Sequence, residues 1–205
     1  MDRLDYPRFT IIMRGYTYDQ ANAILQAMKG FEQDFAVEMT LNTEHALQHI
    51  RKLNEIYGEN ILIGAGTVRS LADAKAAVEA GAKFLLGPHT FSQEMLTYAH
   101  EHAVLAVPAA MTPSEINDMF AKGADIVKVF PATVVTSQFF SDVQAPLGKL
   151  PLMAVGGVNA NNASDFLNKG ASYLGFGSKL FNQTDLLAGD IDSLAASLQT
   201  IVSLA

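Results

Sequence analysis

The sequence predicts an α/β fold, a single-domain (β/α)8 TIM barrel that spans residues 1–205. Short apolar runs rich in β-branched residues alternate with longer amphipathic segments along the whole chain. No two-residue hairpin signal joins neighbouring runs, which indicates parallel strands connected by helical crossovers. No linker or shift in composition divides the chain. The alternative is an open doubly wound sheet, but such sheets normally carry a strong phosphate loop near the start, and this sequence has none.

Local patterns place the individual elements. Eight strands are expected at residues 8–14, 34–40, 60–67, 82–88, 103–109, 125–131, 152–158 and 172–178. Three of the helices between them begin at a polar capping residue and end at a glycine, which are the usual signals of helix boundaries. The three pairs are Thr17 and Gly30, Ser70 and Gly81, and Thr112 and Gly123.

Composition excludes several classes of protein. Apolar residues make up 49% and charged residues 17% of the chain, as in folded globular proteins. A net charge of −7 argues against nucleic-acid binding, which needs a basic face. The absence of cysteine excludes disulfides and thiolate metal sites. No apolar run reaches the ~18 residues of a membrane helix, and "MDRLDYPRFT" lacks the apolar core of a signal peptide. We therefore expect a soluble, cytoplasmic protein.

Three ionisable residues lie inside predicted apolar strands: Lys128, Glu38 and Arg14. Strand alternation puts Lys128 on one face with Ile126, and Glu38 on one face with Ala36. A buried ammonium ion is unfavourable unless it is paired or loses its proton. Either the three side chains point outward between helices, or Lys128 and Glu38 form a structural salt bridge, or the group is functional.

The functional interpretation is covalent chemistry. Burial lowers the pKa of a lysine, and a neutral amine can attack a ketone to form a Schiff base. The protonated imine then draws electrons from the adjacent carbon–carbon bond. Glu38 is the only carboxylate in a comparable position, so it is the candidate for moving protons. We expect Lys128 and Glu38 to be catalytic residues.

Glycine-bearing stretches end three strands: "GAGT" (64–67), "AVGGV" (154–158) and "GFGS" (175–178). Taken singly, each stretch could be no more than a tight turn between a strand and a helix. The last two follow the seventh and eighth strands, where barrels of this class often bind phosphate. We therefore expect Gly156, Gly157, Gly177 and Ser178 to form a phosphate subsite from backbone amides and one hydroxyl.

Metal binding has little support in the sequence. Its five histidines include no H-E-x-x-H pattern. We expect no metal and no other cofactor. His89, which follows a predicted strand, could line the mouth of the barrel.

Seven motifs resemble, in order, the strand-end motifs of the 2-keto-3-deoxy-6-phosphogluconate aldolase family: "VEMTLNT", "IGAGTV", "LLGP", "AVPAAMTPSE", "VKVFPAT", "AVGGV" and "GFGSKLF". This family includes 4-hydroxy-2-oxoglutarate aldolases and 2-keto-3-deoxy-6-phosphogalactonate aldolases. The resemblance covers nearly the whole chain. It implies a metal-free class I aldolase, assembled as a homotrimer, that cleaves a phosphorylated sugar acid to pyruvate and glyceraldehyde 3-phosphate.

The resemblance also implies residue roles. It places the Schiff-base lysine at Lys128 and the acid/base carboxylate at Glu38, and it assigns the two glycines of "AVGGV" and Ser178 to phosphate binding. Thr67 would contact the pyruvyl carboxylate, and Pro88 would line the pocket.

One position departs from the phosphogluconate pattern, which commonly has an arginine where this sequence has Asn42. We expect Arg14, on the adjacent strand, to hold the carboxylate instead, a combination closer to the phosphogalactonate aldolases. Two alternatives remain open. One is a 4-hydroxy-2-oxoglutarate aldolase that yields pyruvate and glyoxylate. The other is a phosphate-binding barrel isomerase or synthase that forms no imine.

Overall fold

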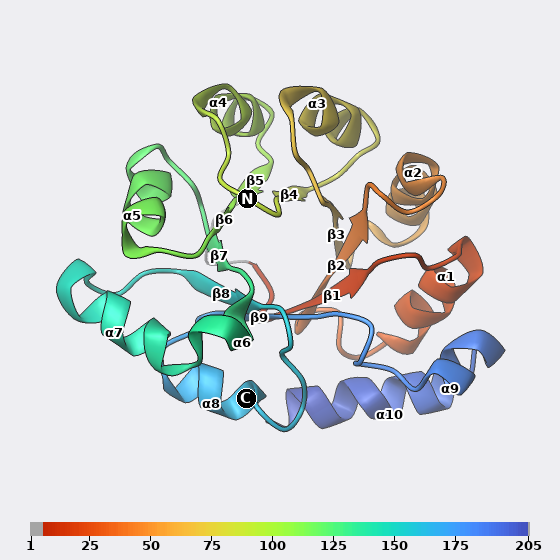
Figure 1. The fold of residues 1–205 in the computed structure, drawn as a ribbon. Coiled ribbons are helices and arrows are strands. Elements are labelled where there is room, and N and C mark those ends of the chain that lie inside the picture. Colours follow the sequence, from red (N-terminus) through yellow and green to blue (C-terminus); the bar gives the residue numbers. More distant parts are fainter. Residues whose placement is uncertain (1–5, 205) are drawn as a thin grey trace.

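A computed structural model of the chain describes residues 6–204, so the two ends of the predicted domain, residues 1–5 and 205, lie outside the described residues. Within that range, one sheet of nine parallel strands is surrounded by helices (Figure 1). The strands are β1 (Phe9–Met13), β2 (Phe35–Thr40), β3 (Leu62–Gly66), β4 (Phe84–Leu86), β5 (Leu105–Val107), β6 (Ala109–Ala110), β7 (Val127–Val129), β8 (Leu152–Val155) and β9 (Tyr173–Phe176). The helices are α1 (Tyr18–Ala27), α2 (Ala46–Tyr57), α3 (Leu71–Glu79), α4 (Gln93–Glu101), α5 (Pro113–Ala121), α6 (Ala132–Val135), α7 (Gln138–Leu147), α8 (Ala163–Asn168), α9 (Gln183–Ala188) and α10 (Ile191–Val202).

The strand order confirms the predicted barrel. Along the sheet it runs β5-β4-β3-β2-β1-β9-β8-β7-β6, and the two end strands are consecutive in the chain. The predicted fifth strand is thus two strands, with β5 paired to β4 and β6 paired to β7. They are separated at Pro108, which has no N–H to donate to the ladder. The Asp125 amide, just before β7, donates to the Ala106 carbonyl of the end strand β5 at 3.1 Å and so links the two edges of the sheet.

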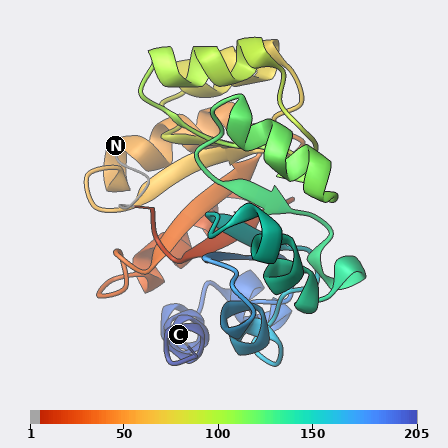
Figure 2. The ribbon, with the colours of Figure 1, turned by 90° about the vertical axis from the view of Figure 1, so that its left-hand side faces the viewer.

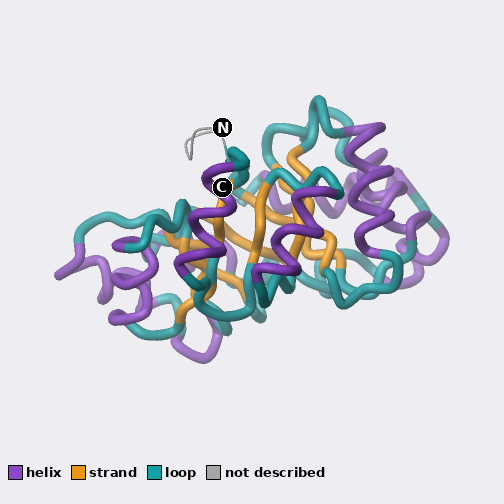
Figure 3. The backbone as a smooth tube through the Cα atoms, turned by 90° about the horizontal axis from the view of Figure 1, so that it is seen from above, coloured by secondary structure: helices purple, strands orange, loops and turns teal. Residues whose placement is uncertain are grey.

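Side chains that alternate along the strands fill two apolar regions. The larger region lies between the barrel and the helices that surround it, which Figures 2 and 3 show from two further sides. The smaller region fills the inside of the barrel and includes Ala36 and Ile126. The predicted faces of β2 and β7 are therefore confirmed, and Glu38 and Lys128 lie on the inner faces of their strands.

Tyr6 fills the amino-terminal end of the barrel interior. It is buried, and its ring makes edge contacts with Phe84 and Tyr173 at centroid distances of 5.3 and 5.5 Å. Its hydroxyl is hydrogen-bonded to Thr10 at 2.9 Å. Side chains therefore occupy this end of the barrel, and the residues predicted to be functional lie toward the other.

The predicted starts of three helices are confirmed, and each helix ends two or three residues before its predicted glycine. Thr17, Ser70 and Thr112 are the N-caps of α1, α3 and α5, and each side chain accepts a hydrogen bond from a first-turn amide. The three predicted glycines that follow these helices adopt φ angles of 91° to 100°, a left-handed conformation that glycine tolerates best. No helix in the described range combines the length and the apolar character that a membrane span requires.

Candidate active site

The residues predicted to be functional lie at the carboxyl-terminal end of the barrel. Lys128 is in the middle of β7, and Glu38 lies two residues before the end of β2. Arg14, Thr67 and Pro88 come just after β1, β3 and β4. Because the strands are parallel, all of these positions meet at one end of the barrel, where enzymes of this fold place their active sites.

Lys128 and Glu38 are buried inside the barrel. The two residues are 5% and 1% exposed, so their side chains do not point outward between helices. The Lys128 ammonium lies 5.0 Å from the centre of the Phe130 ring, close enough for a cation–π interaction. The described residues contain three ion pairs, and none of them joins Lys128 to Glu38. The two groups are electrostatic neighbours without a direct salt bridge.

Burial shifts the pKa values of Lys128 and Glu38 toward each other, and neighbouring charges modify both shifts. Burial raises the pKa of Glu38 above its usual range, against the opposing effect of the Lys128 and Arg14 charges. Burial lowers the pKa of Lys128, Glu38 opposes that shift, and Arg14 adds to it. Lys128 therefore loses its proton more readily than an exposed lysine, and Glu38 holds a proton more readily than an exposed glutamate.

Gly66 makes room for the Glu38 carboxylate. A Cβ atom at Gly66 would lie 1.4 Å from Oε1 of Glu38, so only glycine permits this position of the carboxylate. The other oxygen, Oε2, is buried and has no hydrogen-bond partner among the described residues. An unpaired buried acceptor is unfavourable, and here it is available to a bound molecule. The sequence identified "GAGT" only as a glycine-bearing strand end, so this role of Gly66 was missed.

Arg14 is held by two side chains from neighbouring strand ends. Its Nη1 donates to Oδ1 of Asn42 at 3.0 Å and to Oγ1 of Thr67 at 3.3 Å. These bonds occupy one end of the guanidinium and leave Nη2 and Nε as donors for a carboxylate. Thr67 has a φ of 57°, an unusual conformation for a β-branched residue, and such strain is concentrated at functional sites. The contribution of Asn42 to holding Arg14 was not predicted.

The glycines predicted to bind phosphate lie on two adjacent loops. Gly156 and Gly157 follow β8, Gly177 and Ser178 follow β9, and the two strands are paired. Gly156 and Gly157 have φ angles of 99° and 80°. The loop after β8 is bonded to Thr133, whose amide and hydroxyl both donate to the Gly156 carbonyl, at 3.2 and 3.1 Å. Thr133 was not predicted, although it lies only five residues after Lys128.

Two further residues singled out in the sequence, Pro88 and His89, are linked by fewer hydrogen bonds to the rest of the site. Pro88 is half-buried, and in the part of the chain that the structure describes no hydrogen bond links it to the other predicted residues. His89 is exposed, and its Nδ1 is hydrogen-bonded to the Thr90 carbonyl at 2.7 Å. Between residues 6 and 204, no group of three or more histidine or acidic side chains is arranged to hold a metal ion.

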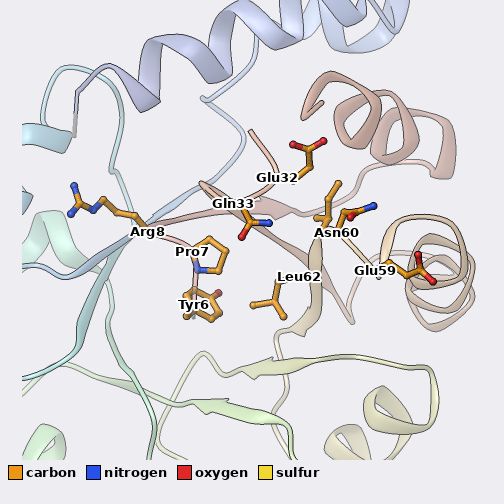
Figure 4. Close-up of a pocket in the computed structure, with 10 residues that line it drawn as sticks. Tyr6, Pro7, Arg8, Glu32, Gln33, Glu59, Asn60 and Leu62 are labelled. Atoms are coloured by element: carbon orange, nitrogen blue, oxygen red, sulfur yellow. The ribbon is translucent and has the colours of Figure 1, made fainter. Parts of the chain in front are cut away.

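A cavity at the opposite end of the barrel is separate from this site. It has a volume of about 510 Å³ and is lined by Tyr6, Arg8, Glu32 and Glu59, among others (Figure 4). These residues precede β1, β2 and β3 or lie beside their starts, whereas Arg14 and its partners follow the same strands. The cavity contains none of the predicted site residues and does not bear on their chemistry.

Comparison with known proteins agrees with the geometry. A family model described as "Aldolase: KDPG and KHG aldolase" matches residues 11–197. The 2-dehydro-3-deoxy-6-phosphogalactonate aldolase of Escherichia coli is 31% identical over 173 residues, which are 83% of this chain and 82% of that protein. A probable enzyme of the same name from Rhizobium meliloti is 29% identical over 93% of this chain and 91% of its own. A solved structure described as native KDPGal superposes with a TM-score of 0.84 at 27% identity, over 96% of this chain and 95% of the other.

Proposed function

The chain belongs to the KDPG and KHG aldolase family, and from this premise we propose that it is a class I aldolase for 2-keto-3-deoxy-6-phospho sugar acids. Its products would be pyruvate and glyceraldehyde 3-phosphate. The observation that carries the proposal is a buried amine, that of Lys128, beside a buried carboxylate, that of Glu38, inside one barrel. We further propose that residues 1–205 form a single catalytic domain.

The proposed reaction begins at the amine. Neutral Lys128 attacks C2 of the keto acid, water leaves, and a protonated imine forms. Glu38 takes the proton of the C4 hydroxyl, directly or through a water. The C3–C4 bond then breaks, its electron pair moves into the imine to form an enamine, and glyceraldehyde 3-phosphate leaves. Protonation of the enamine at C3 and hydrolysis release pyruvate and restore the lysine.

Two further groups of residues would hold the ends of the substrate. We assign the substrate carboxylate to the free edge of the Arg14 guanidinium and to Thr67, whose positions are linked by a hydrogen bond. We assign the phosphate to Gly156, Gly157, Gly177 and Ser178. Holding both ends places C2 near the amine, and such positioning contributes several kcal/mol to catalysis. Pro88 would line the wall between them.

Reductive trapping tests the proposal. Borohydride added with pyruvate should reduce the imine, attach the pyruvyl carbons to Lys128 and abolish activity, because the secondary amine cannot be hydrolysed. Lys128→Ala should take up no label. Lys122→Ala is the matched control, since Lys122 is exposed and pairs with Asp118, and it should be labelled like the wild type. Label on another residue would overturn the assignment, and no label at all would favour a barrel enzyme without imine chemistry.

A second candidate is a 4-hydroxy-2-oxoglutarate aldolase, which the description of the matching family also includes. The two glycine loops favour the phosphorylated substrate, since that alternative has no phosphate for them to bind. Measuring pyruvate release would rank the three candidate substrates: the gluconate-type phosphorylated acid, the galactonate-type phosphorylated acid and 4-hydroxy-2-oxoglutarate.

We further propose the absence of a metal requirement, a cellular location and an assembly state for the enzyme. We expect a metal-free reaction in the cytoplasm that a chelator leaves unchanged, and a homotrimer, as the motif resemblance implies. Sedimentation analysis measures the assembly state, and a monomer would contradict that part of the proposal.

A further inference from the structure

Both glycine carbonyls of the loop after β8 are fixed by hydrogen-bond donors outside the strands. The Gly156 carbonyl accepts two hydrogen bonds from Thr133, one from its amide and one from its hydroxyl. The Gly157 carbonyl accepts two more, from Nδ2 of Asn159 at 3.0 Å and from Nδ2 of Asn162 at 3.1 Å. Four donors thus determine the orientation of two successive peptide groups.

The orientation of each carbonyl determines that of the next amide. In a trans peptide group the C=O and the following N–H point in opposite directions. The bond from Thr133 therefore directs the Gly157 N–H away from Thr133, and the asparagine bonds direct the Val158 N–H away from Asn159 and Asn162. Between residues 6 and 204, neither amide donates a hydrogen bond. Two successive unpaired amides in a left-handed turn are an anion-binding arrangement.

Thr133 also fills the space beside the loop. A Cβ atom at Gly157 would lie 2.6 Å from both Oγ1 and Cγ2 of Thr133, and one at Gly156 would lie 3.1 Å from Cα of Pro131. The loop thus packs directly on the segment that follows Lys128. A shift of Thr133 would move the carbonyls, and with them the amides.

We propose that Thr133 is a positioning residue for the phosphate subsite: its hydroxyl, through the Gly156 carbonyl, holds the amide of Gly157 in the direction needed to bind the phosphate group of the substrate. This inference rests on the proposed function, because it takes the glycine loop to be the phosphate subsite. It adds a residue that does not contact the substrate, and it links the lysine-bearing segment to the place where the far end of the substrate is held.

The experiment is a titration with inorganic phosphate, followed by the amide chemical shifts of the intact protein in NMR spectra. Phosphate should move the Gly157 and Val158 amide signals in the wild type. Thr133→Val, which keeps the shape and removes the donor, should weaken phosphate binding about tenfold, the factor that ~1.4 kcal/mol produces. Thr133→Ser should bind phosphate like the wild type. Thr97→Val, at an exposed threonine of α4, is the control.

Steady-state kinetics distinguish a role of Thr133 in positioning the phosphate subsite from a general structural defect. Thr133→Val should raise KM for the phosphorylated substrate and leave kcat/KM for unphosphorylated 4-hydroxy-2-oxoglutarate unchanged. Equal losses on both substrates, or unchanged phosphate binding, would overturn the inference. If the valine variant does not fold, the wild-type spectra still decide, since unmoved Gly157 and Val158 signals contradict the subsite. Phosphate binding in a wild type that releases no pyruvate would count against the proposed function alone.

Discussion

The pKa of the Lys128 amine is lowered by the combined effect of burial and two neighbouring charges. Burial lowers the pKa most, the negative charge of Glu38 opposes that shift, and the positive charge of Arg14 adds to it. Burial therefore decides the direction of the shift, and the two neighbouring charges adjust its extent. The amine of Lys128 loses its proton at a lower pH than that of an exposed lysine, as a nucleophile requires.

The pH dependence of imine formation follows from these signs. The neutral amine is the reactive form, so the rate of trapping at saturating pyruvate should rise with pH and level off below the ordinary lysine pKa of about 10.4. Glu38→Gln should move this rise to lower pH, because it removes a charge that raises the pKa of Lys128. Arg14→Met should move it to higher pH, because it removes a charge that lowers the same pKa. Shifts in the same direction, or none, would contradict the electrostatic account.

Arg14 shows how a side chain near the surface becomes ordered. A long exposed arginine has many conformations, but Asn42 and Thr67 take both hydrogens of one terminal nitrogen. The guanidinium is then held before a ligand arrives, and its remaining donors are left free. An arginine at position 42 could not accept these hydrogen bonds, so Asn42 suits a site in which Arg14 binds the carboxylate.

At the level of elements, the position of Glu38 depends on the neighbouring strand. β2 and β3 are paired with Thr40 opposite Gly66, and the carboxylate of Glu38 occupies the place of the missing Gly66 side chain. Neither strand alone defines this contact. The register between them does.

Gly66→Ala tests the contact. The methyl group would displace the carboxylate, and activity should fall by a factor of about 10² or more, since general acid–base catalysis contributes ~10²–10⁴. Adding Glu38→Asp should restore part of the activity, because the shorter side chain leaves room for the methyl group. Circular dichroism would show whether each variant is folded. Full activity in Gly66→Ala, or no gain in the double variant, would show that the close approach does not matter for catalysis.

For the whole molecule, the buried pair is unfavourable to stability. The raised pKa of Glu38 means that its ionised form destabilises the fold once the pH exceeds the unfolded pKa. The lowered pKa of Lys128 means that its charged form destabilises the fold at every pH below the folded pKa. Near neutral pH both effects are present, so the two residues that we propose to be catalytic weaken the barrel.

A double variant, Lys128→Met with Glu38→Met, should therefore be inactive and more stable. Replacing a buried charged pair by apolar side chains of similar volume is often stabilising by ~1–4 kcal/mol. Lys128→Met alone should gain less, because it removes the stronger of the two positive charges that act on the buried carboxylate of Glu38. Urea unfolding at neutral pH measures the free energies. A double variant less stable than the wild type would show that the two groups stabilise each other more than burial disfavours them.

Much of the architecture is encoded in short stretches of sequence. The alternation of side chains along strands predicted which residues of β2 and β7 share a face, and the caps at Thr17, Ser70 and Thr112 predicted where helices begin. Both signals depend on neighbours within a few residues, so they can be read without knowing the fold. The division of the fifth strand at Pro108 was missed, because a proline that ends a strand and one that interrupts it have the same local pattern.

The amino-acid sequence was sufficient for the barrel and for the chemical types gathered at its carboxyl-terminal end. It could not specify which of those groups touch: that Arg14 binds Asn42 and Thr67, that Glu38 rests on Gly66, or that Thr133 holds the Gly156 carbonyl. The physical reason is distance along the chain. Periodicity and capping act between close neighbours, whereas these contacts join different strand ends and exist only once closure of the sheet sets the register.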